Sequence, residues 1–388
     1  MSASETTDWH QAQLVDVARS DAPIGYGIVQ PGPYERDGIP VAAIRDLPKP
    51  SIQKTHRSSP SIEAAYRRSR VVAGDILISV KGTTGRVGII PAGFSGNISR
   101  DVARLRLRDE HEPAYWFQML QSPQAQRRLQ QAAVGSTRQE LSIGTLKKLR
   151  VGFPSRREQE RIAEVLPAAD QLIAALQRVL AKKRALTQGM MQQLLTGKIR
   201  FPGFTDEWQE RSLGEVAGIN TGSRDSQDKN PGGRFPFFVR SATVERIDSY
   251  SYDGEAVLVP GEGGIGSIFH YVNGKFEVHQ RVYKISDFAP DVRGRFVYHY
   301  MRQFFGAHAM KHSVKATVDS LRLPTFRSFA VTLPRSDEQL AIAAVLDDAE
   351  AEITVLENQL TKARDVKQGM MQELLTGQTR LPIEDDAA

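Results

Sequence analysis

The longest hydrophobic pattern in the chain is a seven-residue repeat that occurs in two separate stretches. In the first, two rows interleave at spacings of three and four: Leu166, Ile173, Leu180, Thr187 and Leu194, and Ile162, Ala169, Leu176, Lys183 and Met190. In the second, the rows are Leu346, Ile353, Leu360, Lys367 and Leu374, and Ile342, Ala349, Leu356, Ala363 and Met370. This spacing places both rows on one face of an α-helix, as in a coiled-coil seam. Each stretch is predicted to be one helix of about 40 residues, roughly 60 Å long.

Glycine and proline mark the expected ends of these helices. Gly197 and Gly377 stand where a helix C-terminus favours glycine, and Pro202 and Pro382 follow soon after. Pro167 lies inside the first stretch, although proline lacks the N–H that an intact helical ladder uses. We therefore expect either a kink at Pro167 or the start of the regular part of the helix there.

The two helical stretches are copies of one sequence. Aligned at an offset of 180, residues 154–202 and 334–382 are identical at 24 of 49 positions. A helix of this length is poorly stable alone in water, so each copy needs a partner along its seam. Net charges of +5 for residues 156–202 and −8 for 336–388 favour pairing of the two copies with each other. The alternative is that each helix packs only on its own globular domain.

The duplication reaches into the segments that precede the helices. Trp9, Leu14, Val17 and Ala18 recur as Trp208, Leu213, Val216 and Ala217, and Thr137 and Leu141 recur as Thr317 and Leu321. Between these ends the copies diverge, and the first is 19 residues longer. Apolar runs bounded by glycine predict strands at 74–80 and 255–261, and helices are expected at roughly 113–132 and 292–312.

These patterns predict an α+β protein with a pseudo-two-fold internal repeat. Two mixed α/β domains are expected to be joined by two long antiparallel coiled-coil helices. The expected boundaries are 1–155 for the first domain, 156–202 for the first helix, 203–335 for the second domain, and 336–388 for the second helix and tail.

Composition narrows the class of protein. A content of 40% hydrophobic and 25% charged residues is typical of folded globular domains. The chain has no run of about 18 apolar residues and no secretory signal at its N-terminus, so we expect a cytoplasmic protein without a membrane span. The absence of cysteine excludes disulfides and thiolate metal sites. A net charge of +6, with +7 on residues 1–155, favours a polyanionic partner.

A search for catalytic motifs finds little chemistry. No Asn-Pro-Pro-Tyr-like tetrapeptide and no Walker A motif is present, and the glycine-rich stretches at 82–88 and 261–267 are interpreted as tight turns or DNA-facing loops. His308 and His312 have the spacing of a helical metal site but lack the glutamate of a zinc protease, so a structural or solvent-facing pair is favoured. No metal and no cofactor is predicted.

The junctions between domain and helix carry a family resemblance. Pro154-x-x-x-Glu158-Gln159-x-x-Ile162-Ala163-x-x-Leu166 returns as Pro334-x-x-x-Glu338-Gln339-x-x-Ile342-Ala343-x-x-Leu346. This motif resembles the passage from target-recognition domain to conserved helix in specificity subunits of type I restriction–modification enzymes. DGIPVAAIRDL (37–47) and, more plainly, PFFVRSATV (236–244) resemble an early stretch of such domains. The likeness covers nearly the whole chain.

The resemblance implies a DNA-recognition subunit without catalytic activity. In that family one recognition domain binds each half of a split sequence in double-stranded DNA. The subunit also docks two methylation (M) subunits and, through them, restriction (R) subunits. Two alternatives stay open: a DNA methyltransferase or nuclease with an unrecognised active site, and a coiled-coil adaptor without a DNA role.

Candidate DNA contacts are cationic and polar side chains on loops, because phosphate and base-edge contacts use these residue types. In the first domain they are Lys81, Thr83, Thr84, Arg86, Arg100, Arg138 and Gln139, the last two within Ser136-Thr137-Arg138-Gln139. In the second domain they are Arg224, Lys229, Arg234, Arg240, Lys275, Gln280, Arg281 and Lys315.

A repeated decapeptide suggests a further contact surface. QGMMQQLLTG at 188–197 returns as QGMMQELLTG at 368–377. Met191, Leu195, Met371 and Leu375 lie off the predicted seam and are the same in both copies. We interpret them as a surface that meets two copies of one partner, for which the family supplies the methylation subunit. The alternative is that each pair packs on the duplicated ends of the domains.

Overall fold

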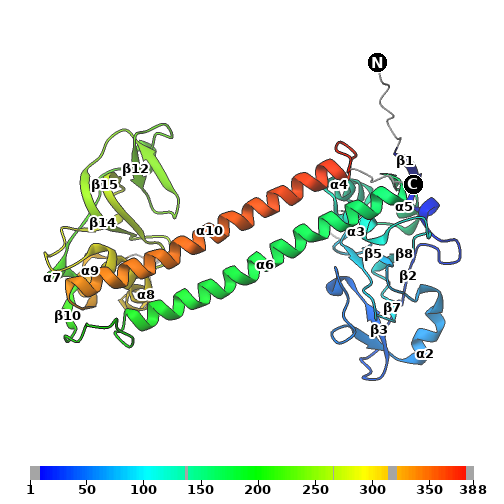
Figure 1. Cartoon of the computed structure of the whole chain (residues 1–388), viewed down its shortest axis with the longest axis horizontal. Coiled ribbons are helices and arrows are strands. Elements are labelled where there is room, and N and C mark those ends of the chain that lie inside the picture. The colour runs from blue at the N-terminus through cyan, green and yellow to red at the C-terminus, as the bar shows by residue number, and fades with distance from the viewer. Residues whose placement is uncertain (1–8, 136–138, 265, 313–320, 382–388) are drawn as a thin grey trace, which may run out of the picture. The chain divides into compact units, whose positions relative to one another are not determined.

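The fold is described from a computed structural model that covers residues 9–135, 139–264, 266–312 and 321–381. The chain forms two compact units (Figure 1). Unit 1 comprises Met1–Leu176 and Gln359–Ala388, and unit 2 comprises Gln177–Asn358. We call the globular part of unit 1 domain 1 and that of unit 2 domain 2. Each unit thus contains one domain and a part of each long helix.

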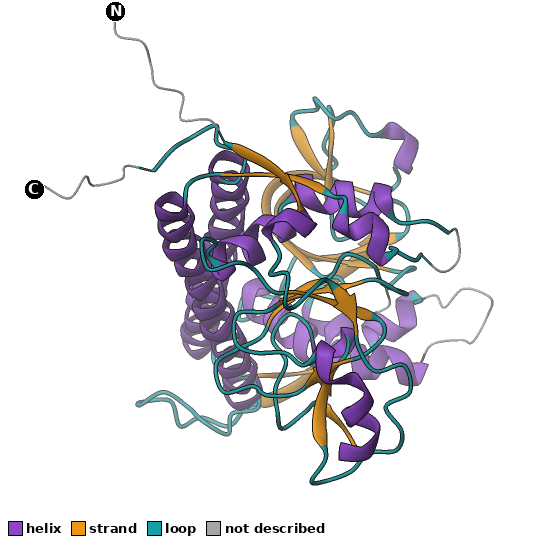
Figure 2. Ribbon diagram, turned by 90° about the vertical axis from the view of Figure 1, so that its right-hand side faces the viewer, coloured by secondary structure: helices purple, strands orange, loops and turns teal. Residues whose placement is uncertain are grey.

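The two predicted helices are present as α6, Arg156–Leu194, and α10, Ser336–Leu374, of 39 residues each. They lie side by side (Figure 2) and run antiparallel in both units, because the start of one helix meets the end of the other. None of the twenty predicted seam positions is exposed. Helix α6 runs through Pro167 as one element, so the expectation that its regular part starts there is wrong.

Ion pairs between the helices follow the predicted charge difference in one unit only. In unit 2 the cations lie on α6, where Arg184 pairs with Glu357 at 2.6 Å and Lys183 pairs with Glu352. In unit 1 the direction is reversed, because Lys367 of α10 pairs with Asp170 of α6 at 2.6 Å. The pairing of the two copies is confirmed, but net helix charge does not decide each contact.

The helices end as the glycines predict. Gly197 and Gly377 have φ values of +68° and +76°, which favour glycine because a side chain is strained there. A Cβ on Gly377 would lie 2.7 Å from the Trp9 ring, and one on Gly197 would lie 3.4 Å from the Trp208 ring. Each helix end therefore packs on the tryptophan that opens the domain of its unit.

A duplicated frame connects each domain to its helices. In unit 1 the frame is β1 (His10–Gln13), α1 (Leu14–Val17) and β9 (Arg150–Phe153), with β1 antiparallel to β9. In unit 2 it is β10 (Gln209–Ser212), α7 (Leu213–Val216) and β17 (Ala330–Leu333), with the same pairing. The amide of Leu14 donates to Leu149 at 3.0 Å, and that of Leu213 donates to Phe329 at 2.8 Å. This confirms the repeat read from the tryptophan-to-valine spacing.

The central sheets share one strand order in both units. Domain 1 has a four-stranded sheet of β2 (Gly25–Tyr26), β8 (Val102–Leu105), β5 (Ile76–Ser79) and β6 (Val87–Ile89), and a three-stranded sheet of β4 (His56–Ser58), β3 (Ile39–Ala42) and β7 (Asn97–Ile98). Domain 2 has one sheet of β11 (Gly218–Thr221), β16 (Val282–Ser286), β14 (Tyr252–Pro260), β15 (His270–Val278), β12 (Phe235–Phe238) and β13 (Val244–Ile247). The long β15 pairs with both β14 and β12, whereas domain 1 uses the separate strands β6 and β7 for these roles.

Short helices complete each domain. The segment predicted as one helix at 113–132 is two helices, α3 (Pro113–Gln121) and α4 (Pro123–Ala132), because Ser122 caps α4 and Pro123 starts it. The predicted helix near 292–312 is α8, Gly294–His312. The others are α2 (Pro60–Glu63), α5 (Ile143–Lys147), α9 (Leu323–Arg327) and the 3₁₀ turns η1 (Ile44–Asp46), η2 (Ala64–Ser69) and η3 (Ser226–Asp228).

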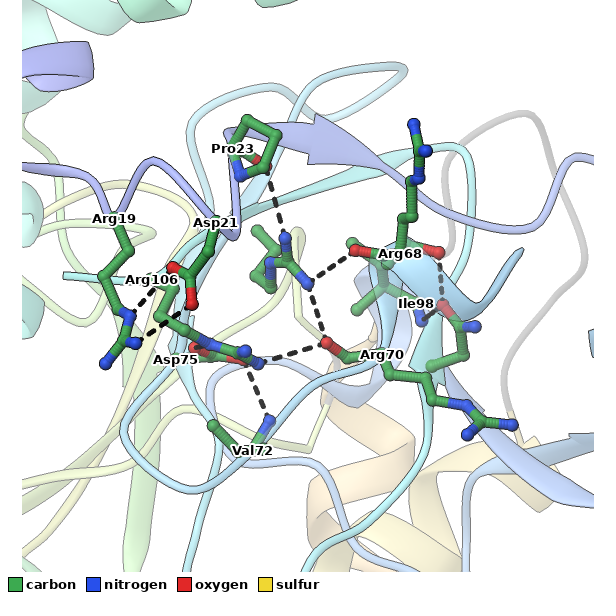
Figure 3. Close-up of polar contacts among 12 residues, drawn as sticks. Arg19, Asp21, Pro23, Arg68, Arg70, Val72, Asp75, Ile98 and Arg106 are labelled. Carbon is green, nitrogen blue, oxygen red and sulfur yellow. Dashed lines mark hydrogen bonds and ion pairs between the residues drawn. The ribbon is translucent and has the colours of Figure 1, made fainter.

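A buried polar network lies where β8 ends and β5 begins in the domain 1 sheet (Figure 3). Asp75, 2% exposed, accepts hydrogen bonds from Arg106 Nε at 2.8 Å and Nη2 at 2.7 Å. The buried Arg104 guanidinium donates to three backbone carbonyl oxygens, those of Pro23, Arg68 and Arg70. Burial lowers the pKa of Arg104, since a desolvated charge is disfavoured. These arginines hold the strand that leads to the loops described next.

Candidate nucleic-acid interface

Three loops of domain 1 meet at one end of the central sheet. The end of β5 meets the start of β8 because the strands are antiparallel, and the Val80 amide donates to Asp101 at 2.8 Å. The Leu141 amide donates in turn to Val80 at 2.8 Å. The β5–β6 hairpin loop, the turn at 99–101 and the segment at 139–141 therefore converge. We call this surface the loop end of domain 1.

Several predicted residues gather at this loop end. The Thr84 hydroxyl donates to Gln139 Oε1 at 3.2 Å, and Lys81 pairs with Glu140 at 3.1 Å. The Arg100 side chain is 52% exposed and is paired with its neighbour Asp101 at 3.6 Å. A surface ion pair of this kind contributes little stability, so Arg100 can exchange it for another anion. Thr83 lies in the same hairpin loop and is exposed.

Arg86, predicted as a DNA contact, is exposed and makes hydrogen bonds within domain 1. Its Nη2 donates to the Leu47 carbonyl oxygen at 3.0 Å, and its amide donates to Ser79 Oγ at 2.8 Å. The side chain thus ties the hairpin to the loop after β3. Two of the three glycines of 82–88 serve the same turn, with φ values of +74° at Gly82 and +83° at Gly85, whereas Gly88 lies in β6.

The equivalent loops of domain 2 also converge. The Leu321 amide donates to the Gly261 carbonyl oxygen, and the Gly261 amide donates to that of Arg281, each at 2.8 Å. The Gln280 amide donates to the Arg224 carbonyl oxygen, also at 2.8 Å. The turn after β15, the loop after β14 and the segment after β11 therefore meet at the loop end of domain 2. The glycine-rich stretch at 261–267 is this loop after β14; Ile265 lies outside the described residues.

Three predicted residues of domain 2 contact two carboxylates at this loop end. Glu262 pairs with Arg240 at 3.5 Å and with Arg281 at 3.4 Å. Gln280 Nε2 donates to Asp225 at 2.9 Å. The neighbouring Arg224 pairs instead with the buried Glu277 at 3.6 Å. Glu262 and Asp225 were not predicted; their role depends on which loops meet in space, which spacing along the chain does not reveal.

A buried histidine supports the turn of domain 2. His279 is 2% exposed, and its Nδ1 accepts the Arg281 amide at 2.9 Å. Burial is the largest cause of its lowered pKa, with the nearby Arg240 charge acting in the same direction. The neutral ring therefore positions the backbone of Arg281.

Other predicted residues lie away from the loop end of domain 2. Arg234 precedes β12 and lies 5.4 Å from the Phe235 ring, whereas Arg240 follows the other end of that strand. Lys275 pairs in register with Asp253 near the start of β14, remote from Glu262 beyond its end, and lies 4.9 Å from the Tyr250 ring. Lys229 pairs with Glu245 at 3.2 Å. Ser136, Thr137, Arg138, Lys315 and Thr317 lie outside the described residues.

The two loop ends carry different side chains on the same backbone geometry. Ser99 forms a parallel bridge with Ile28, and His279 forms one with Arg224. The next amides, of Arg100 and Gln280, donate back across these bridges at 2.9 and 2.8 Å. Arg100 and Gln280 therefore occupy equivalent positions, one able to donate only and the other able to donate and accept.

The off-seam residues of the decapeptide are buried within the protein, which corrects their interpretation as a partner surface. Met191 and Leu195 are 6% and 1% exposed and pack in the core of unit 2 with domain 2. Leu375 is 4% exposed and packs in the core of unit 1 with domain 1, where Met371 is partly buried against it. Because both domains present the same frame, both helices need the same apolar residues there.

The junction glutamates bind arginines that follow the helices. Arg200 Nε and Nη2 donate to Glu338 at 2.9 and 2.7 Å in unit 2, and Arg380 makes the same bidentate pair with Glu158 in unit 1. Both carboxylates are 1% exposed. The junction motif thus joins the start of one helix to the end of the other.

The histidines found on α8 take part in structural contacts. His308 Nε2 lies 2.9 Å from the Thr325 carbonyl oxygen, which agrees with a structural role; the His312 side chain is not described. His299, Asp347 and Glu350 lie close enough to ligate one ion. However, Arg295 binds Asp347 at 2.7 Å and Arg302 binds Glu350, so the carboxylates are already neutralised. This group is an ion-pair network between α8 and α10.

Comparison with known proteins identifies the relatives of this architecture. A family model described as type I restriction modification DNA specificity domain matches residues 34–182 and 205–363. The chain is 29% identical over 223 residues to the EcoBI specificity subunit and over 170 residues to the EcoDI specificity subunit, both of Escherichia coli. These matches cover 55% and 44% of this chain but 46% and 37% of the relatives, so the aligned part spans about half of their length or less.

Solved structures show the same fold. The S subunit of the type I restriction–modification system of M. genitalium has a TM-score of 0.68 at 15% identity, covering 96% of this chain and 98% of that one. The HsdS subunit of Thermoanaerobacter tengcongensis has a TM-score of 0.52 at 17% identity, covering 96% and 97%. Among the described residues, no helix is long and apolar enough to cross a membrane.

Proposed function

Because the chain belongs to the type I restriction modification DNA specificity family, we propose that it selects the DNA sequence on which such an enzyme complex acts. Each domain reads one half of a split site through its loop end. The observation that carries this proposal is the equivalence of Arg100 and Gln280, which present different chemistry at one backbone position. Two readers built on one frame fit a site with two different halves.

The loop ends carry the residue types that contact DNA. On this proposal Lys81, Arg100, Arg240 and Arg281 contact phosphates or guanine edges, and Gln280 reads a base edge. Thr83, Thr84, Gln139 and Arg224 support them. Glu262 and Asp225 hold the cationic and amide groups of domain 2 in place until DNA competes for them. Of the other predicted contacts, Arg86 ties the hairpin to its support, and Arg234 and Lys275 lie elsewhere.

The complex supplies the chemistry. We propose that double-stranded DNA and two methylation subunits are the partners of this non-catalytic chain, and that restriction subunits join through them. The repeated packing of both units supports two copies of one partner, since each unit offers the same frame and helix ends. The buried residues of the decapeptide are not that contact.

A domain exchange tests the proposal. Replacing residues 19–135 with the same region of another recognition domain should change one half of the methylated motif in a host genome and leave the other half unchanged. A change in both halves would contradict independent readers. Methyl transfer by the isolated chain would favour an enzyme instead, and the absence of salt-dependent DNA retention by the assembled complex would favour an adaptor.

A further inference from the structure

A cavity opens beside Arg100 at the loop end of domain 1. Its volume is about 390 Å³. Apolar side chains form most of its wall, namely Ile28, Val29, Pro31, Val41, Ala43 and Ile44. The polar residues that line it are Arg45, His56, Ser99, Arg100 and Asp101, and Arg100 is paired with Asp101. Val29 is 38% exposed although it is apolar.

Domain 2 fills the same place with its own side chains. The parallel register pairs Val41 with Asn97 in domain 1 and Phe237 with Glu277 in domain 2. Phe237 therefore stands where domain 1 has Val41, and His279 stands where it has Ser99. Both domain 2 residues are buried, and their rings are 6.5 Å apart. The open volume in domain 1 follows from these two smaller residues.

We propose that this cavity receives the 5-methyl group of a thymine in the half-site read by domain 1. This inference rests on the proposed DNA function. Among the groups that base pairs present in the major groove, the thymine methyl is the apolar one; the others donate or accept hydrogen bonds. A cavity lined mostly by apolar side chains, with two arginines beside them, matches a methyl group on an otherwise polar, anionic duplex. Arg100 then contacts the adjoining base or phosphate.

Uracil substitution tests this inference, because deoxyuridine lacks only the methyl group. The full chain, assembled with its methylation subunits, is titrated with duplexes in which each thymine of the domain 1 half-site is replaced in turn. We expect one replacement to weaken binding about fourfold, the factor for burying one methyl group. Replacements in the other half-site and the flanks should have no such effect through this cavity.

A variant that copies domain 2 completes the test. Val41→Phe introduces the residue that the equivalent position of domain 2 already holds, and it should abolish the difference between thymine and uracil. Val72→Phe is the matched control, because Val72 is 50% exposed in the same domain and does not line the cavity. This control should discriminate like the parent.

The outcomes separate this inference from the proposed function. Specific binding without any uracil effect, or a domain 1 half-site without thymine on either strand, overturns the methyl pocket alone. Tighter binding when the thymine is mispaired indicates that a whole base leaves the stack, and it also overturns the methyl pocket. Loss of sequence-specific binding by the assembled parent overturns the proposed function.

Discussion

Removing the cation of a buried junction pair should destabilise unit 2 strongly. Glu338 is 1% exposed and accepts two hydrogen bonds from Arg200, which is 22% exposed. Arg200→Met keeps an unbranched apolar stem but leaves the carboxylate buried without its cation. Breaking a buried pair from one side costs about 3–5 kcal/mol. Because Arg200 is partly exposed, we expect the lower end, about 3 kcal/mol.

Thermal unfolding of the full chain measures this effect. For a folded unit of about 180 residues, 1 kcal/mol shifts the melting temperature by roughly 2–4 °C, so a fall of about 6–12 °C is expected. Hydrogen exchange should show lost protection in the frame of unit 2, over β10 and β17. Arg380→Met should destabilise unit 1 in the same way, because it leaves the buried Glu158 carboxylate without its cation.

Two further variants make the reasoning refutable. Arg161 and Glu164 are an ion pair on α6 with side chains 51% and 69% exposed, so Arg161→Met should cost less than about 0.5 kcal/mol. The double variant Arg200→Met/Glu338→Met should recover much of the loss, because two apolar side chains leave no unpaired buried charge. If Arg200→Met melts like Arg161→Met, the junction pair does not hold the unit together.

Three other variants test the helix seam, the pH dependence of stability at Glu63, and the proposed contact of Arg100 with DNA. Ile173→Asp should lower the free energy of unfolding by about 2 kcal/mol, and by less than Leu180→Asp, because Ile173 is only half-buried whereas Leu180 is 6% exposed. Equal losses of stability in the two variants would mean that the seam is assigned incorrectly. The hydrogen bond from Arg70 is the largest cause of the lowered pKa of Glu63, so its stabilisation is present above the unfolded value of about 4.3 and lost as pH falls through the folded value. Glu63→Gln should therefore melt below the parent at pH 7 and approach it near pH 3; a constant gap counts against this. Arg100→Gln should alter only the half of the methylated motif that domain 1 reads. An unchanged motif would show that Arg100 does not contribute to sequence recognition.

The helices and the repeat could be predicted because their sequence pattern is local and occurs in two copies. Seven-residue spacing fixes the face of a helix without knowledge of the rest of the fold. Ile173 and Ile353 lie on the predicted seam but are only half-buried. In the middle of each helix the other helix covers the seam, whereas Leu166 and Leu346 near the helix starts also pack on a domain core.

The loop ends could be predicted only in part, because they depend on contacts between distant segments. Lys81, Arg100 and Gln139 are far apart in sequence and meet through the β5–β8 register, which composition does not encode. Arg234 and Lys275 have the expected residue types, but Arg234 precedes β12, whereas Arg240 follows it, and Lys275 lies within β15. The interpretation of the decapeptide as a partner surface is wrong for a similar reason. Its apolar residues off the seam pack on the domain frame, and that contact depends on the three-dimensional fold.

The division of unit 1 into two chain segments sets the order in which the two units can fold during translation. Unit 2 is continuous in sequence, so residues 177–358 can fold together as soon as they leave the ribosome. Domain 1 emerges first, but Gln359 onwards, which brings Leu374 and Leu375 into its core and Gly377 against Trp9, emerges last. At 5–20 residues per second the intervening stretch takes about 10–40 s to make. During that time the nascent chain carries an unfilled apolar site on domain 1, which a chaperone or a second nascent chain can occupy before the protein's own C-terminal helix arrives.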